Sequence, residues 1–276
     1  MKKIICIALS ALAIAACCNK PHKLVILHVN DTHSHFEPVL TEEGVLRGGS
    51  IERAAFIDSV RNAVGEENVL LLHAGDFSQG SSYFTELHGD LEIDVMNAMH
   101  FDATALGNHE FDNGLEDLGR RLANLNCPVV CANYDFSPFE AGKYVKPWII
   151  VEKAGLKIGI TGLLCNLSTM IDRNTADRIP KFEDAEEINK WAKYLKEEEH
   201  CDLVISLNHI GYEDEEYIDS EMVRDTRNVD LVVGGHSHTF LEKMEYAVNL
   251  DGVEVPIVQD GCWGLNVGVI EIPLGK

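Results

Sequence analysis

Short runs of apolar and β-branched residues alternate along the chain with segments in which apolar residues recur every three or four positions. Each short run stops at a polar residue or a glycine, which is typical of buried strands. Strands are therefore predicted over Lys23–Val29, Val69–His73, Val129–Ala132, Ile149–Val151, Lys157–Leu163, Leu203–Leu207 and Leu231–Val233.

Helices are predicted between these strands. Leucine, valine and alanine recur at helical spacing in the segments 91–98 and 115–125. The sequence Asp184–Glu187 resembles a capping box, which predicts the start of a charged helix that reaches Glu199.

The last part of the chain has a different pattern. Asp251-Gly252 predicts a hairpin turn, and strands are expected to follow at Val255–Val258 and Val267–Ile272. The order of all these elements predicts an α/β fold in which two mixed sheets pack together and are flanked by helices.

The composition is that of a folded protein with an acidic surface. Hydrophobic residues make up 46% of the 276 residues and charged residues 25%, so a substantial core is available and global disorder is excluded. Lys and Arg number 23 against 45 Asp and Glu, a formal net charge of −22. Such a surface repels phosphate backbones, so no nucleic-acid partner is expected. Small anionic substrates remain compatible with this charge, because bound metal ions reverse the local field.

The first residues are typical of a targeting segment rather than of a fold. Lys2 and Lys3 precede an apolar stretch of 13 residues, Ile4–Ala16, which is too short to span a bilayer and suits a secretory signal. The next residue is Cys17, and the join resembles the cleavage and acylation site of bacterial lipoproteins. We predict a lipoprotein signal peptide at 1–16, lipidation at Cys17, a short linker at 17–22 and one domain at 23–276. The lipid would anchor the exported domain to a membrane, on its periplasmic or cell-surface side; an ordinary cleaved signal peptide is the alternative.

Polar residues that can ligate metals form five blocks, at 30–35, 74–80, 106–112, 208–209 and 234–238, and four of these blocks directly follow an expected strand. A single histidine at such a position is more often a hydrogen-bonded structural residue, but five blocks together indicate a site at the edge of the sheets. They contain only oxygen and imidazole ligands, a set suited to Mn²⁺, Zn²⁺ or Fe²⁺, and one carboxylate can bridge two such ions. The candidate ligands are Asp31, His33, Asp76, Asn108, His209, His236 and His238.

The order of these blocks, D-x-H, G-D, G-N-H-E, N-H and G-H-x-H, resembles the calcineurin-like metallophosphoesterase superfamily. Within it, the sequences at 30–33, 73–76 and 107–112 are similar to those of the bacterial 5′-nucleotidase family, in its N-terminal metallophosphatase domain. The resemblance extends from about Leu24 to the segment 261–268. It implies a four-layer α/β/β/α sandwich, the metallo-dependent phosphatase fold.

The resemblance also implies how the ligands divide between two divalent ions. Asp76 would be shared by both ions. His109 would face the substrate as a catalytic residue oriented by Asp112, and Asn108 would serve both as a ligand and in catalysis. Glu110 is expected to have a structural role. The first ion would be held by Asp31, His33, Asp76 and His238, and the second by Asp76, Asn108, His209 and His236.

The function that follows is an exported, dinuclear metal-dependent phosphoesterase that hydrolyses phosphate monoesters of nucleotides. A phosphodiesterase acting on 2′,3′-cyclic nucleotides or nucleotide sugars is one alternative, and a non-catalytic binding module of the same fold is another. Family members commonly continue into a second domain that holds the base, whereas this sequence stops at Lys276. We therefore expect a separately encoded substrate-binding domain as a partner. The aromatic residues are spread singly along the sequence, so little preference for the base is expected from this chain alone.

Overall fold

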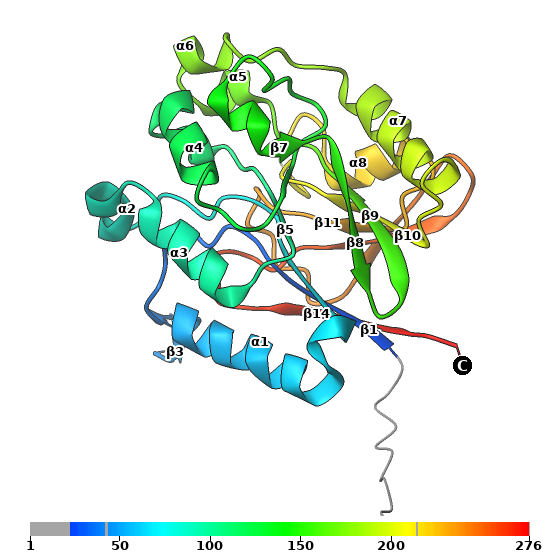
Figure 1. Ribbon diagram of the computed structural model, residues 1–276, viewed down its shortest axis with the longest axis horizontal. Helices are drawn as coiled ribbons and strands as arrows, with labels where there is room; N and C mark the ends of the chain where they lie inside the picture. The colour runs from blue at the N-terminus through cyan, green and yellow to red at the C-terminus, as the bar shows by residue number, and fades with distance from the viewer. Residues whose placement is uncertain (1–22, 42–43, 214, 276) are drawn as a thin grey trace, which may run out of the picture.

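The computed structural model describes residues 23–41, 44–213 and 215–275, which form two six-stranded mixed sheets with helices around them (Figure 1). The predicted signal peptide at 1–16, the linker at 17–22 and the lipidated Cys17 lie outside the described residues. Within the described part of the chain, no helix is long and apolar enough to cross a membrane.

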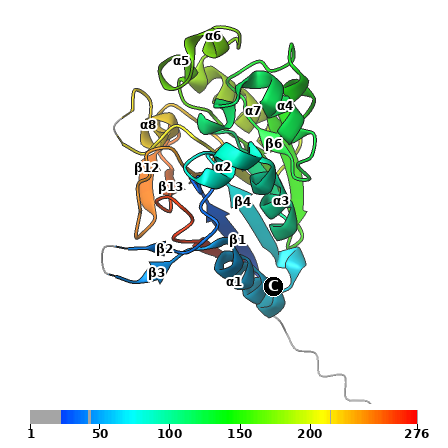
Figure 2. The ribbon, with the colours of Figure 1, turned by 90° about the vertical axis from the view of Figure 1, so that its left-hand side faces the viewer.

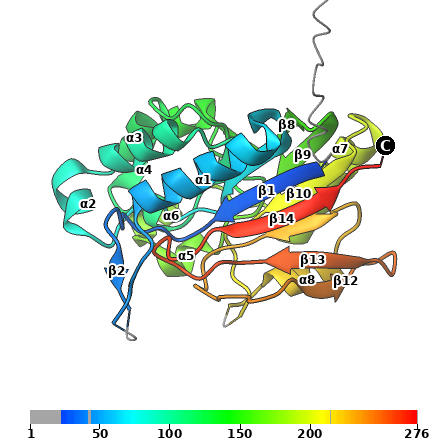
Figure 3. The same ribbon diagram turned by 90° about the horizontal axis from the view of Figure 1, so that it is seen from below.

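The first sheet has the strand order β14-β1-β4-β5-β6-β7. β14 runs antiparallel to β1, and the two strands lie side by side (Figure 3), whereas the other neighbours are parallel. The strands of this sheet are β1 (Lys23–Val29), β4 (Val69–His73), β5 (Ala103–Ala105), β6 (Val129–Val130), β7 (Val145–Lys146) and β14 (Gly268–Pro273).

The second sheet has the order β12-β13-β11-β10-β9-β8, with parallel strands in the middle and one antiparallel pair at each edge. A small hairpin of β2 (Val39–Leu40) and β3 (Leu46–Arg47) projects from the body of the molecule (Figure 2). The strands of the second sheet are β8 (Trp148–Lys153), β9 (Leu156–Thr161), β10 (Leu203–Leu207), β11 (Leu231–Val233), β12 (Glu245–Val248) and β13 (Glu254–Val258).

The helices connect the strands. The α-helices are α1 (Ser50–Val64), α2 (Ser82–Leu87), α3 (Asp90–Met99), α4 (Gly114–Leu122), α5 (Leu167–Met170), α6 (Arg173–Ala176), α7 (Asp184–Glu197) and α8 (Asp219–Arg224). Short 3₁₀ turns lie at η1 (Glu66–Asn68), η2 (His109–Phe111) and η3 (Glu140–Lys143).

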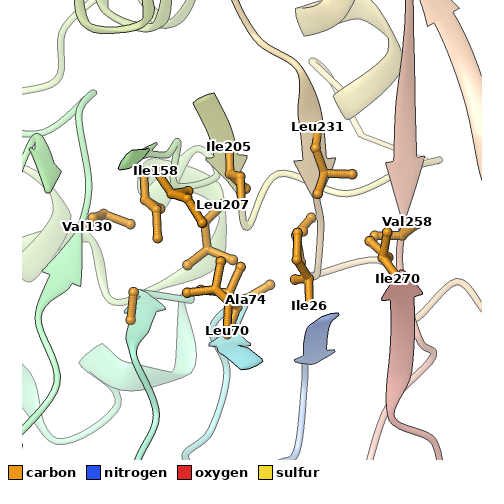
Figure 4. Close-up of a cluster of buried hydrophobic side chains, with 14 of the residues drawn as sticks. Ile26, Leu70, Ala74, Val130, Ile158, Ile205, Leu207, Leu231, Val258 and Ile270 are labelled. Carbon is orange, nitrogen blue, oxygen red and sulfur yellow. The ribbon is translucent and has the colours of Figure 1, made fainter. Parts of the chain in front are cut away.

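The main core lies between the two sheets (Figure 4). Ile26 and Leu70 extend from the first sheet toward the second, where Ile205 and Leu231 belong to the same buried cluster. Such strands are buried on both faces, and this explains why they are near-continuous apolar runs in the sequence.

The outer face of each sheet packs against helices. Leu71 of β4 lies in one cluster with Ile57 of α1 and Met96 of α3. Val232 of β11 lies in another cluster, with Leu195 of α7 and further residues of α8. The layers are therefore helices, sheet, sheet and helices, and the predicted α/β/β/α sandwich is confirmed.

The predicted strands at 23–29, 69–73, 203–207 and 231–233 match the observed bounds, and the predicted turn at 251–252 joins β12 to β13. The predicted capping box at Asp184 is wrong. Glu183 occupies the N-cap position of α7 without a side-chain cap, and α7 ends at Glu197. Asp184 instead accepts a hydrogen bond from Asn133 Nδ2 at 2.7 Å, because its carboxylate faces the loop after β6.

Candidate metal centre

The candidate ligands lie where parallel strands of both sheets end. Asp31 follows β1 and Asp76 follows β4, whereas His209 follows β10 and His236 follows β11. The structure brings these residues into one cluster, although they come from different sheets. Three overlapping groups have ligand atoms within 4.8 Å of one another: Asp31, His33 and His238; His33, Asp76 and His109; and Asp76, His209 and His236.

Asp76 lies between the two outer groups of this cluster. Its Oδ2 is 3.1 Å from His209 Nε2 and 3.8 Å from His33 Nε2. Burial alone would raise the pKa of the Asp76 carboxyl, but the nearby imidazoles of His209, His33 and His109 outweigh burial and hold the pKa below its ordinary range. Asp76 is therefore a buried carboxylate, in a position from which one side chain can serve two cations.

Asn108 lies beside this cluster, at the start of η2. Its side chain is buried, and its Oδ1 accepts a weak hydrogen bond from the Cys165 thiol at 3.7 Å. The N–H of the next residue, His109, donates to Asp76 Oδ1 at 2.9 Å. All seven sequence-predicted ligands are thus placed in or against one site.

The histidine rings are oriented as metal ligands require. His209 Nδ1 lies 2.7 Å from the carbonyl oxygen of Ala74, and His33 Nδ1 lies 3.3 Å from that of Ser78, so each ring directs Nε2 into the cluster. A backbone carbonyl on the far nitrogen fixes the tautomer in which Nε2 can bind a metal. The Nε2 atoms of His209 and His236 are buried and make no well-aligned hydrogen bond within the described structure. These donors therefore fit divalent cations, which would supply the missing partners.

The backbone of the site is held in a conformation that side chains disfavour. Five of the seven candidate ligands have φ between 47° and 86°: Asp31, His33, Asp76, His236 and His238. The left-handed region costs a non-glycine residue about 1 kcal/mol or more, and such residues concentrate at functional sites. This strain was not visible in the sequence, and it marks the same residues independently of the motifs.

Glu110 holds two of the ligand loops together. Its fully buried carboxylate accepts hydrogen bonds from the N–H groups of Asp76 at 2.9 Å, Ser78 at 3.0 Å and Gly107 at 2.6 Å. Burial, together with the neighbouring Asp76, raises the pKa of Glu110 to about 7. The expected structural role of Glu110 is confirmed, since it joins the loop after β4 to the loop after β5.

His109 and Asp112 form a pair on the open side of the cluster. His109 Nδ1 lies 2.9 Å from Asp112 Oδ2, and both side chains are 32% exposed. The hydrogen bond with Asp112 raises the pKa of His109 despite partial burial of the ring. The His109 ring also meets the His33 ring edge to face, with centroids 5.2 Å apart. An imidazole whose charged form is favoured by a neighbouring carboxylate can stabilise negative charge or donate a proton.

Two residues at the site were missed in the sequence. Glu215 Oε1 lies 3.2 Å from His236 Nε2. The one sequence feature that could have indicated Glu215 is the acidic run after Gly211. Trp263 donates its backbone N–H to the carbonyl oxygen of Asp31 at 2.6 Å. The sequence feature that could have indicated Trp263 is its place in a glycine-rich stretch of the C-terminal segment.

Comparison with known proteins agrees with this geometry. Residues 24–240 match the family described as calcineurin-like phosphoesterase. The chain belongs to this family. The match includes every candidate ligand, and it confirms the resemblance found in the motifs.

The chain is also similar to named nucleotidases. It is 32% identical to a snake venom 5′-nucleotidase of Naja atra over 91% of this chain and 50% of that protein. A 5′-nucleotidase precursor from Thermus thermophilus superposes with a TM-score of 0.82 at 32% identity, over 92% of this chain and 52% of that one. An NAD nucleotidase from Haemophilus influenzae superposes with a TM-score of 0.79 at 30% identity, over 90% and 47%. The chain spans about half the length of the curated relatives it matches.

Proposed function

We propose that this chain is a dinuclear metal-dependent phosphoesterase that hydrolyses phosphate monoesters of nucleotides. The observation that supports it is Asp76, a buried carboxylate between two groups of ligand atoms, with the His109–Asp112 pair beside the same cluster. The relatives named 5′-nucleotidases support the substrate class.

In this proposal, Asp31, His33, Asp76 and His238 hold one ion, and Asp76, Asn108, His209 and His236 hold the other. Two divalent ions, of Mn, Zn or Fe, would polarise the phosphoryl oxygens and lower the pKa of a bound water. The oxygen and imidazole donors of the cluster suit these metals.

His109 is the side chain that would act on the substrate directly. A protonated imidazole at this position would stabilise charge on the phosphoryl group or donate a proton to the leaving alkoxide. Asp112 accepts from Nδ1, so it fixes the ring orientation and leaves Nε2 to face the substrate. Glu110 holds the loop of Asp76 and the loop of Asn108 at a fixed position relative to each other.

The test is a screen of purified protein reconstituted separately with Mn²⁺, Zn²⁺ and Fe²⁺. Nucleoside monophosphates, 2′,3′-cyclic nucleotides and nucleotide sugars would be compared under the same conditions, with phosphate release as the readout. The proposal expects the highest kcat/KM for nucleoside monophosphates. Faster turnover of cyclic nucleotides or nucleotide sugars would establish the phosphodiesterase alternative, and binding without turnover would establish the non-catalytic module.

We also propose that the protein is exported and anchored through Cys17. The support is the basic and apolar sequence before Cys17. Cys17→Ser is expected to abolish incorporation of labelled fatty acid and partitioning with membranes in a bacterial host. Labelling that persists in the variant would contradict Cys17 as the lipid site. The separately encoded substrate-binding domain stays a prediction, to be tested by the base preference of this chain alone.

A further inference from the structure

Two aromatic rings that are far apart in the sequence stack at the edge of the metal centre. The imidazole of His35 and the indole of Trp263 have centroids 5.1 Å apart and planes inclined by 23°. Trp263 is 40% exposed.

Both residues are tied by short links to candidate ligands. His35 is two residues after His33, and its Nδ1 lies 2.8 Å from the carbonyl oxygen of His33. On the other side, the backbone N–H of Trp263 donates to the carbonyl oxygen of Asp31 at 2.6 Å. The ring pair is therefore held beside the group formed by Asp31, His33 and His238.

Trp263 belongs to none of the buried hydrophobic clusters in the described part of the chain. The other two tryptophans, Trp148 and Trp191, lie in an aromatic group with Tyr194, between β8 and α7. Trp263 instead has φ of 60°, which is uncommon for a bulky residue. A strained, exposed tryptophan beside a ligand cluster matches the pattern in which strain is retained for function.

We propose that the His35–Trp263 pair is a stacking surface for the base of a nucleotide whose phosphate lies at the candidate metal centre. This inference rests on the proposed function and adds a subsite to it. His35 supports one face of the indole, and the exposed part of the indole is available to an aromatic ring. Stacking on a tryptophan accepts every base, because each base has a π face. The pair would therefore favour nucleotides over phosphoesters that lack a ring and would discriminate weakly between bases.

The test compares Trp263→Ala with the wild type on two substrates that differ only in the base, adenosine 5′-monophosphate and ribose 5-phosphate. A stacked base is worth about 1–3 kcal/mol, so the ratio of the two KM values is expected to change by about 5–150-fold. Trp263→Phe retains a ring and should keep most of the wild-type ratio. Tyr246→Ala, at a 57% exposed aromatic residue on β12, is the matched control and should leave the ratio unchanged.

The outcomes separate this inference from the proposed function. A loss of turnover for both substrates in equal measure, or no change for either, would contradict the stacking surface while leaving the phosphoesterase intact. A second readout needs no turnover: adenosine is expected to quench tryptophan fluorescence in the wild type, and Trp263→Phe should abolish this quenching. Quenching that persists in Trp263→Phe would overturn the inference. Quenching that is lost in the variant, in a protein that hydrolyses no phosphomonoester, would support the subsite and contradict the proposed reaction.

Discussion

The site consists of a buried set of residues and an exposed set, and the two differ in how they are held. The buried set is Asp31, Asp76, His209 and Glu110, each no more than 2% exposed. The exposed set is His109, Asp112 and Trp263, whose side chains or residues are 32–40% exposed. The side chains of the first set hydrogen-bond to backbone groups in the loops that follow β4, β5 and β11. In the second set, His109 and Asp112 pair through their side chains.

Because of this difference, substitutions should be able to change metal binding and substrate chemistry separately. A change in the buried set leaves buried polar groups without partners, which is costly in free energy. A change in the exposed set leaves water to solvate the groups that remain. Metal content and stability should therefore follow the buried set, and turnover or substrate preference should follow the exposed set.

The largest effect is expected from Asp76→Asn. The substitution removes the negative charge that lies between the two ligand groups, so both ions should lose occupancy and turnover should fall with them. Loss of an outer hydrogen-bonding partner of a ligand already costs about 10–100-fold, and a shared ligand should cost more. Elemental analysis and turnover are the measurements, with Asp58→Asn on the exposed side of α1 as the control. Retention of both metals and near-normal turnover in Asp76→Asn would show that the ligand assignment is wrong.

The next effect distinguishes the exposed His109 from a candidate metal ligand, His236. His109→Ala is expected to lower turnover by about 10²–10⁴-fold, the usual contribution of an acid–base group, without a change in metal content. His236→Ala should lose metal as well as turnover, because its buried Nε2 points into the cluster. If metal analysis shows the same content in the two variants, the division between catalytic pair and ligands does not hold.

Glu110→Ala should act on stability. The variant leaves the N–H groups of Asp76, Ser78 and Gly107 buried without their acceptor. Each such group costs about 1–3 kcal/mol, so the free energy of unfolding should fall by about 3 kcal/mol or more. Glu110→Gln keeps one oxygen that can accept from Asp76 and Gly107, and should lose less. Denaturant unfolding measures both, and equal midpoints for the wild type and Glu110→Ala would contradict the role of Glu110 as a link between loops.

The smallest effect concerns Asp219. It accepts a hydrogen bond at 2.8 Å from Nδ2 of Asn208, the residue before the candidate ligand His209. Burial raises the pKa of Asp219 from 3.8 to about 7. The folded state therefore holds the Asp219 proton more tightly than the unfolded state does. As the pH rises between these two pKa values, the free energy of unfolding falls, by about 2–3 kcal/mol between pH 5 and pH 8. Asp219→Asn keeps the acceptor oxygen and removes the charge, so it should flatten this dependence. Urea unfolding of the metal-free protein at both pH values is the measurement, and an unchanged slope would contradict the prediction.

The parts of the fold that the sequence predicts well are long, apolar and buried. β1 and β4 are recognisable because each is a run of five or more residues buried between two layers. β5 (Ala-Thr-Ala) and β7 (Val-Lys) were missed because they are short and contain no run of large apolar residues. The equally short β6 (Val-Val) and β11 (Leu-Val-Val) have such a run and were predicted. α1 was missed because its buried positions include Arg53 beside Ile57 and Val64, which breaks the apolar stripe.

The site divides in the same way. The ligand motifs stand next to strand ends, so their convergence follows from the sheet topology and could be predicted. Glu215 and Trp263 reach the site through loops, whose course depends on packing that no local pattern encodes. The stacking of His35 on Trp263 joins residues that are more than two hundred positions apart, and only the fold shows it.

The pairing of β1 with β14 also determines when the first sheet can form during synthesis of the chain. Lys23 lies opposite Pro273, so β1 pairs on one side with a strand more than two hundred residues later in the sequence. Contacts across so long a loop close slowly, and a chain synthesised from its amino end keeps that side of β1 unpaired until β14 has emerged. An open strand edge invites pairing with other chains. A chain interrupted before Gly268 would therefore carry all its candidate metal ligands and yet be prone to aggregate, so a usable site depends on β14 as well as on the ligands.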